Sequence, residues 1–412
     1  MPPRRPMPEV PAEPGLLITA PRPIPAEPGL LITAPRLIPA SAGSGVLAPG
    51  YVAVAAGLVT EVGQGPPPRA PDLALDTGVL VPGLVDLQVN GYFGEELRTA
   101  GAAGWAAVAG GLTATGATSY LPTFITAPLQ ELTASLRSAA VITAARPAGG
   151  ARVLGVHLEG PFIAPSRRGA HNAAWIVPPS AAAIDELLAA GAGLVRLVTL
   201  APELDGGIAA VRQLTEAGVL VSVGHSDATA EVVAAAAGAG ARMVTHLYNA
   251  QRPLHHREPG VVGQALADPR LTSGLIADLR HVAAQACVIA FAAAPGRICL
   301  VTDAAACAGM PPGAYLLGGE PIELPPAGGE PPVRADGTLA GSALRMDAAV
   351  ANMAAAGVGL AAAVAAASRI PADLIGRPEL GRIAPGAAAD LAWLGDDLRA
   401  KATWVAGEKV FG

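Results

Sequence analysis

Short runs rich in valine, leucine and isoleucine recur along the chain, and alanine-rich helical stretches separate most of them. Eight such runs cover residues 85–89, 118–121, 153–158, 194–200, 219–223, 243–247, 274–277 and 298–302. Alternating strands and helices are typical of parallel strands with helices outside. Eight units in about 220 residues predict an α/β fold with a closed (β/α)₈ TIM-like barrel. An open doubly wound sheet is the alternative, but no G-x-G-x-x-G motif opens its first turn.

Short β runs also occupy the two ends of this region. They cover residues 51–55, 58–62 and 73–75, and similar short β runs recur over residues 389–411. We predict that segments 29–81 and 380–412 combine into a small β-sandwich domain, which leaves 82–379 for the barrel. The alternative is a pair of unrelated β extensions.

The N-terminal region contains a tandem duplication. Residues 11–24 (PAEPGLLITAPRPI) recur as residues 25–38 (PAEPGLLITAPRLI). One copy can serve as an edge strand and the other is surplus, so we expect residues 1–28 to be a disordered extension. Two copies are too few for a solenoid.

Composition narrows the class of protein. The 412 residues are 51% hydrophobic and 15% charged, which is too apolar for a disordered chain. The net charge is −6 and no basic run follows Arg4 and Arg5, so we expect no nucleic-acid surface.

The cellular setting follows from two further patterns. The three cysteines form neither a zinc pattern nor a disulfide framework, which indicates free thiols in a reducing compartment. The uncharged stretch 99–130 is interrupted by Gly and Pro, so it predicts a helix and a strand rather than a membrane span. We expect a cytoplasmic protein with no membrane partner.

Residues capable of chemistry collect at the carboxyl ends of the predicted strands. They are Gln88, Asn90, His157, Glu159, His225, His246, His281 and Asp303. Barrel active sites lie on this face. All seven histidines also fall between residues 157 and 281. This joint placement predicts an active site, although any one of these residues taken alone would more often be structural.

Three of these residues make a metal-binding set. Glu159, His225 and His246 offer one carboxylate and two imidazoles from separate strands, the composition of a catalytic zinc site with an open position. Such a metal polarises a carbonyl and lowers the pKa of water to about 7. Asp303 is then the candidate proton shuttle. The alternatives are a turn-capping role for Glu159 and an Asx turn or helix N-cap at Asp303.

Two absences favour a single metal ion. The only lysines are Lys401 and Lys409, so no carbamylated lysine can bridge two ions at a strand end. The first predicted strand ends Gln88-Val89-Asn90 rather than His-x-His. We therefore predict one divalent metal ion per subunit, with zinc or iron suiting the ligands. Gln88 and Asn90 either orient water or the metal's surroundings, or simply make strand-end hydrogen bonds.

Several motifs carry a family resemblance. They are VPGLVDLQVNG (81–91), TSYLPTFIT (118–126), GVHLEGPFIAPSRRGAHN (155–172), VSVGHSDAT (221–229), THLYNA (245–250), REPGVVG (257–263), VTDA (301–304), DGTLAGSAL (336–344) and GRIAPGAAADLAWL (381–394). At these positions the sequence resembles the N-acetylglucosamine-6-phosphate deacetylases of the amidohydrolase superfamily. The resemblance extends over nearly the whole chain from about residue 45.

The resemblance implies roles for particular residues. Glu159, His225 and His246 match the metal ligands, Asp303 matches the catalytic acid/base, and His171 matches a histidine that polarises the acetyl carbonyl. Gln88 stands where single-metal members carry glutamine. The positions that match substrate contacts are Ala170, His171, Asn249, Ala250, Arg257, His281, Leu339, Ala340 and Gly341.

Arg257 matches a phosphate-binding arginine that such enzymes can receive from the neighbouring subunit, which implies a homodimer. Its alternative is a solvated surface arginine, and the alternative for His281 is a helix cap. The sequence departs from the family at Leu279-Arg280, where glycine is usual, and at Gln251-Arg252, where methionine is common. Arg280 is a candidate second phosphate ligand.

The expected reaction is hydrolysis of the N-acetyl group of N-acetylglucosamine 6-phosphate to glucosamine 6-phosphate and acetate. The partner is thus a small amino sugar phosphate. The alternative is deacetylation of another N-acyl amino sugar or small N-acyl compound. A more remote alternative is a sugar-phosphate-binding protein that has lost catalysis.

Overall fold

The computed structural model describes residues 29–412 except 42, 44, 146–148 and 327–328. Eight parallel strands form its centre, and each pairs with the next in chain order. They are β6 (Leu84–Val89), β9 (Ala117–Ile125), β11 (Val156–Glu159), β12 (Val195–Leu200), β13 (Leu220–Val223), β14 (Met243–Val244), β15 (Thr272–Ile276) and β16 (Ile298–Val301). Each of the eight predicted runs overlaps one of these strands, although not always over its whole length.

The last strand returns to the first. The backbone N–H of Asp303 donates to the carbonyl of Gln88 at 2.9 Å, and Val89 forms a parallel bridge with Ala304. Buried Asp86 on β6 also accepts from the Thr302 hydroxyl at 2.5 Å. These contacts nearly close the sheet into a barrel, which confirms the predicted fold and excludes the open doubly wound sheet.

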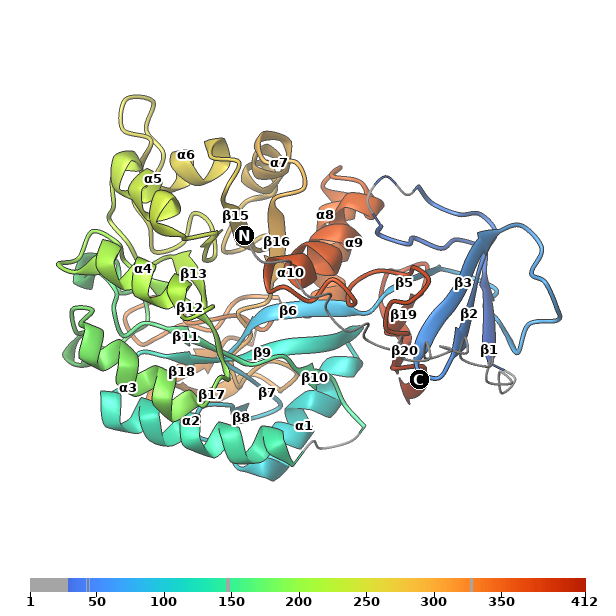
Figure 1. Cartoon of the computed structure of the whole chain (residues 1–412), viewed down its shortest axis with the longest axis horizontal. Helices are drawn as coiled ribbons and strands as arrows, with labels where there is room; N and C mark the ends of the chain where they lie inside the picture. Colours follow the sequence, from blue (N-terminus) through green and yellow to red (C-terminus); the bar gives the residue numbers. More distant parts are fainter. Residues whose placement is uncertain (1–28, 42, 44, 146–148, 327–328) are drawn as a thin grey trace, which may run out of the picture.

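Helices surround the barrel on its outside (Figure 1). They are α1 (Ala102–Thr113), α2 (Leu129–Ala144), α3 (Ala181–Gly191), α4 (Gly207–Glu216), α5 (Ala230–Ala239), α6 (Gly260–Ala267), α7 (Ala284–Ala293), α8 (Met346–Ala355), α9 (Leu360–Ala367) and α10 (Arg369–Leu374). Strands covered by helices are buried on both faces, and every residue of β6 and β9 is buried accordingly.

The two ends of the described chain build a second body beside the barrel (Figure 1). One sheet has the order β3-β2-β1-β4, and the other has the order β21-β20-β19-β5. The strands are β1 (Leu30–Ala34), β2 (Gly50–Ala55), β3 (Leu58–Gln64), β4 (Leu73–Ala74), β5 (Val79–Pro82), β19 (Leu391–Leu394), β20 (Ala400–Val405) and β21 (Glu408–Phe411).

One apolar cluster joins the two sheets, with Ile32 and Val52 from the first packing in the same core as Leu391 and Trp404 from the second. This arrangement confirms the β-sandwich formed from N- and C-terminal segments, and the alternative of unrelated extensions is wrong. Its division from the barrel at 81/82 and 379/380 stays a prediction. The second copy of the repeat supplies β1, which is an interior strand because the two-residue β4 pairs with its other side. The prediction of disorder for residues 1–28 lies outside the described residues.

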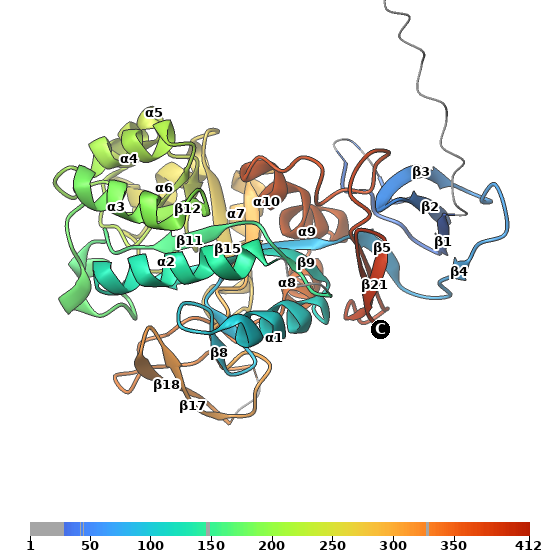
Figure 2. The same ribbon diagram turned by 60° about the horizontal axis from the view of Figure 1, so that its bottom comes forward.

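The remaining elements are short pieces that precede or follow the barrel strands. The predicted run 153–158 is divided into β10 (Arg152–Val153) and β11 because Gly155 between them has φ +140°. Short pieces β7 (Gly91–Tyr92), β8 (Glu95–Glu96), η1 (Pro165–Arg167) and η2 (Ala173–Trp175) follow strand ends. A hairpin of β17 (Gly313–Leu317) and β18 (Glu320–Leu324) follows β16 and projects from the barrel (Figure 2).

That hairpin packs through Leu317 and Ile322 against Ile125 at the end of β9. The stretch 99–130 forms α1 and β9, as expected. No helix in the described ranges combines the length and apolar character needed to cross a membrane. Cys287, Cys299 and Cys307 are buried free thiols.

Candidate active site

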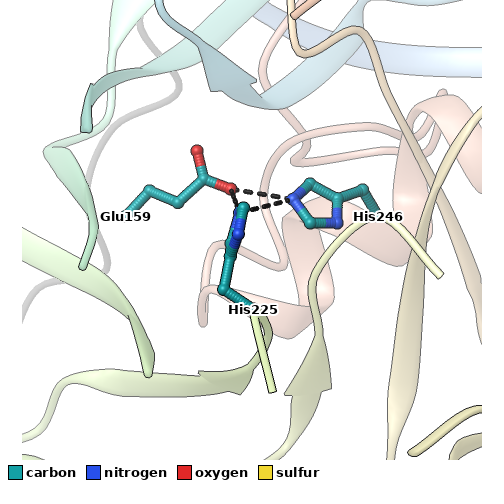
Figure 3. Close-up of side chains that lie close together, drawn as sticks. All are labelled: Glu159, His225 and His246. Atoms are coloured by element: carbon teal, nitrogen blue, oxygen red, sulfur yellow. Dashed lines mark hydrogen bonds and ion pairs between the residues drawn. The ribbon is translucent and has the colours of Figure 1, made fainter. Parts of the chain in front are cut away.

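Three side chains from separate strand ends converge at the carboxyl face of the barrel (Figure 3). Glu159 ends β11, His225 follows β13 and His246 follows β14, and all three are buried. Both histidines have positive φ, +48° and +28°, so the chain turns sharply at the end of each strand. Such backbone conformations are uncommon outside glycine and cluster at functional sites.

The three ligand atoms form a small triangle. Glu159 Oε1 lies 3.2 Å from His225 Nε2 and 2.9 Å from His246 Nε2, and the two nitrogens are 3.1 Å apart. Ligands about 2.0–2.2 Å from one cation stand roughly 3.0–3.5 Å from each other. The cluster therefore has the dimensions of a metal site and could hold a metal ion.

The tautomer of His225 also fits a metal ligand. Its Nδ1–H donates to the carbonyl of Arg167 at 2.9 Å, which leaves the Nε2 lone pair facing Glu159 and His246. Burial alone would lower the pKa of His246, but its hydrogen bond with Glu159 and the charge of that carboxylate outweigh burial and raise it. A proton or a cation between these groups is needed to offset the repulsion of their lone pairs.

Asp303 stands beside the triangle and is held by two amides. Gln88 Nε2 donates at 3.0 Å and Asn90 Nδ2 at 2.7 Å, both to Asp303 Oδ1. Gln88 Nε2 also lies 3.0 Å from Glu159 Oε1, so it connects the two carboxylates. Burial, followed by repulsion from Glu159, raises the pKa of Asp303 to about 7. Both amides donate to Oδ1, and neither of them contacts Oδ2.

His171 lies beside His225, one corner of the triangle. Its ring centre is 4.3 Å from that of His225, and its Nδ1 is 2.7 Å from the hydroxyl of Thr126. Burial and the nearby His225 hold its pKa well below the usual range, so the ring is neutral. When the Thr126 O–H donates to Nδ1, the proton of the neutral ring is on Nε2.

A cavity of about 340 Å³ opens above these residues. Its walls contain Asn90, Ala170, Asn249, Ala250, Leu339 and Gly341 from the sequence prediction, besides the five ionisable residues already placed. His281 also lines it, and its Nδ1 lies 2.6 Å from the Asp278 carboxylate. Ala340 is fully buried and packs beneath the cavity wall with the hairpin.

Other candidates lie elsewhere. Arg257 is on an exposed loop outside this cavity, where its guanidinium contacts His256 at 2.9 Å. Arg280 also lies outside and pairs with Glu330 at 3.3 Å, because Leu279 turns the chain with φ +63°. His157 is buried beneath the site between Thr123 and Thr199, and burial lowers its pKa to about 4.

Three residues with evident roles here were not singled out from the sequence: Thr126 beside His171, Asp278 beside His281, and Arg167 in the cavity wall. Thr126 ends the motif TSYLPTFIT just after β9. A search for polar residues at the carboxyl ends of the strands (the strand-end rule) could therefore have found it. Asp278 follows β15 in the same way. Arg167 belongs to η1, a loop position that no periodic pattern marks.

A model of the amidohydrolase family matches residues 79–410. The chain belongs to the amidohydrolase family. This amidohydrolase is 40% identical to the N-acetylglucosamine-6-phosphate deacetylase of Bos taurus over 83% of this chain and 86% of that protein. It is also 40% identical to the N-acetylgalactosamine-6-phosphate deacetylase of Escherichia coli O157:H7, over 81% of this chain and 88% of that protein.

Solved structures agree with these sequence matches. A variant of the Mycobacterium smegmatis N-acetyl-D-glucosamine-6-phosphate deacetylase, in complex with N-acetyl-D-glucosamine 6-phosphate, superposes with a TM-score of 0.88. It is 35% identical, and the match covers 94% of this amidohydrolase and 100% of that chain. These relatives confirm the resemblance to N-acetylglucosamine-6-phosphate deacetylases that the sequence motifs indicated.

Proposed function

We propose that this amidohydrolase removes the N-acetyl group from N-acetylglucosamine 6-phosphate, releasing acetate and glucosamine 6-phosphate. The observation that carries the proposal is the buried triangle of Glu159, His225 and His246, with Asp303 beside it at the floor of a cavity. The printed names of its relatives support the same reaction.

We infer one divalent cation per subunit at this triangle, with zinc first and iron as the alternative, because one carboxylate and two imidazoles suit both. When bound, the cation polarises the acetyl carbonyl and lowers the pKa of water. The amide ends of Gln88 and Asn90 provide no imidazole or thiolate for a second ion.

The protein's own groups then handle the proton. Asp303 Oδ2 takes a proton from the attacking water and returns it to the departing nitrogen, because an amine anion is a very poor leaving group. Asn90 and Gln88 fix the orientation of this carboxyl through Oδ1. His171 donates from Nε2 to the carbonyl oxygen as negative charge develops there, which requires that the Thr126 hydroxyl donate to His171 Nδ1 rather than to the nearby carbonyl of Glu159.

The cavity wall holds the sugar phosphate. We propose that Ala170, Asn249, Ala250, His281, Leu339 and Gly341 form the substrate-binding surface, with the buried Ala340 supporting Leu339 and Gly341 from beneath. Asp278 fixes His281 so that its Nε2 faces the cavity. Because Arg257 lies outside the cavity of its own chain, we propose that it enters the site of a partner in a homodimer. We also propose a cytoplasmic location, as the free thiols indicate.

A second substrate is favoured by a specific observation. The relative that acts on N-acetylgalactosamine 6-phosphate is as similar to this chain as the bovine enzyme is. The two sugars differ only in the configuration at C4. The test therefore compares acetate release from both phosphates, and from unphosphorylated N-acetylglucosamine, by purified metal-analysed protein.

We expect the wild-type protein to have its highest kcat/KM with N-acetylglucosamine 6-phosphate. The Asp303→Asn variant should release almost no acetate. A preference for the galactose epimer would correct the substrate but keep the reaction. Absence of acetate from all three compounds, with metal present, would contradict the proposed function.

A further inference from the structure

An anionic phosphate bound in the cavity needs a positively charged donor beside it. Among its lining residues in the described part of the chain, Arg167 is the one arginine, and none is a lysine. Arg257, the residue expected to bind phosphate, lies outside the cavity of its own chain. A cationic side chain that belongs to the same chain is therefore already in the wall.

Arg167 is held so that one edge of its guanidinium is available. Its Nε and Nη2 both donate to Asp227 Oδ1, at 2.9 and 2.7 Å. Its Nη1 makes no hydrogen bond within the ranges that the structure describes. Asp227 also accepts from Arg252 Nη2 at 3.1 Å through its other oxygen. One carboxylate thus serves two guanidinium groups and neutralises Arg167 only in part.

The loop that carries Arg167 lies beside the Asn249–Ala250 wall of the cavity. The carbonyl of Ala250 accepts from Ser226 N at 3.2 Å, and Asp227, which holds Arg167, is the next residue. A Cβ at Gly169 would be 3.8 Å from the Cβ of Ala250, so the Arg167 loop packs directly against Ala250. The Arg167 carbonyl in turn accepts from His225. The residue therefore stands between the triangle and the Asn249–Ala250 wall.

We propose that Arg167 binds the phosphate group of the substrate through its free Nη1 edge and selects 6-phosphorylated sugars. This inference rests on the proposed function. Guanidinium suits this task because it stays charged and donates in a fixed plane to phosphate oxygens. The phosphate is then bound by two arginines of different origin, Arg167 from the same chain and Arg257 from the partner subunit.

The chain offers a matched control. Arg252 shares the same Asp227 carboxylate but lines a different depression, beside α5 and α6. Arg167→Gln and Arg252→Gln therefore both remove one guanidinium from this carboxylate, and only the first removes a donor from the cavity. Arg167→Lys keeps the charge but loses the two-point hold on Asp227.

The experiment measures kcat and KM of the metal-loaded variants with N-acetylglucosamine 6-phosphate and with N-acetylglucosamine, together with the binding of glucosamine 6-phosphate by calorimetry. For Arg167→Gln we expect KM for the phosphorylated substrate to rise roughly ten- to hundredfold, the loss typical of a hydrogen bond to a charged group. Binding of glucosamine 6-phosphate should weaken by the same factor, while kcat/KM for N-acetylglucosamine stays unchanged. Arg252→Gln should retain wild-type KM, and Arg167→Lys should fall between.

Equal losses on the two substrates would overturn the proposal, since they would show that Arg167 acts only by supporting His225. Equal effects of Arg167→Gln and Arg252→Gln would also overturn it. If the wild-type protein released no acetate from either substrate, the proposed function would fail. The calorimetry would still decide whether Arg167 binds a sugar phosphate.

Discussion

Replacing Asp303 with asparagine separates the proton-transfer role from metal binding. Asparagine has nearly the same shape, and its Oδ1 can still accept from Gln88 Nε2 and Asn90 Nδ2, as the carboxylate does at 3.0 and 2.7 Å. It cannot take a proton at the position of Oδ2. General acid–base catalysis contributes typically about 10²- to 10⁴-fold, so kcat should fall by at least that factor.

The same substitution has a predictable effect on the stability of the metal-free protein. Burial raises the pKa of Asp303 from 3.8 to about 7, a difference of about 3 units. At about 1.36 kcal/mol per unit, ionising this carboxyl in the folded state costs up to about 4 kcal/mol. Because the folded pKa is raised, the wild-type protein loses this stability as pH rises from about 4 through 7.

Metal-free Asp303→Asn should therefore be more stable than metal-free wild type at pH 8, and the difference should disappear toward pH 4. Acetate release, metal content by mass spectrometry and urea unfolding at both pH values provide the three measurements. Loss of the metal together with activity would refute the role assigned here, because it would make Asp303 a ligand. Retained activity would refute the proton transfer.

Four other predictions concern separate parts of the account. Glu159→Gln should lose most of its bound metal, measured by mass spectrometry after dialysis, and full retention would exclude Glu159 as a ligand. Thr126→Val should lower kcat roughly ten- to hundredfold with little change in KM, since such outer hydrogen bonds typically have effects of this size; an unchanged kcat would remove the tautomer argument. Burial raises the pKa of Asp86 to about 7, so the free energy of unfolding of the wild-type protein should fall between pH 4 and 7. In urea titrations, Asp86→Asn should make this fall smaller; an equal fall would contradict the raised pKa of Asp86. After subunits of Arg257→Gln and Asp303→Asn are mixed in equal amounts and exchanged, the mixture should have about a quarter of wild-type activity at subsaturating substrate, because half of the dimers are mixed and each mixed dimer has one complete site; no recovery would contradict the shared site.

The hydrophobic pattern predicted the barrel well because parallel strands buried on both faces appear as continuous apolar runs. The hydrophobic pattern predicted less accurately the residues at which individual strands begin and end. Only Met243 and Val244 of the run 243–247 pair as a strand, because the chain turns at His246 with φ +28° to direct that side chain into the site. The run 153–158 was divided at Gly155 for a similar conformational reason.

The strand-end rule brought together Glu159, His225, His246 and Asp303 because barrel topology forces the carboxyl ends of the strands to meet. It could not place groups on loops. Arg167 reaches the cavity from η1, and Arg280 is turned away toward Glu330 by the backbone at Leu279. Such positions depend on loop conformation, which has no period in the sequence.

The most direct test of the account is anomalous diffraction from crystals of the metal-loaded Asp303→Asn variant soaked with N-acetylglucosamine 6-phosphate. We expect one anomalous peak, about 2.0–2.2 Å from a Glu159 oxygen and from Nε2 of His225 and His246, with the acetyl carbonyl beside it. A peak held by other groups, or a second peak of equal height in the barrel, would contradict the single-cation deacetylase site.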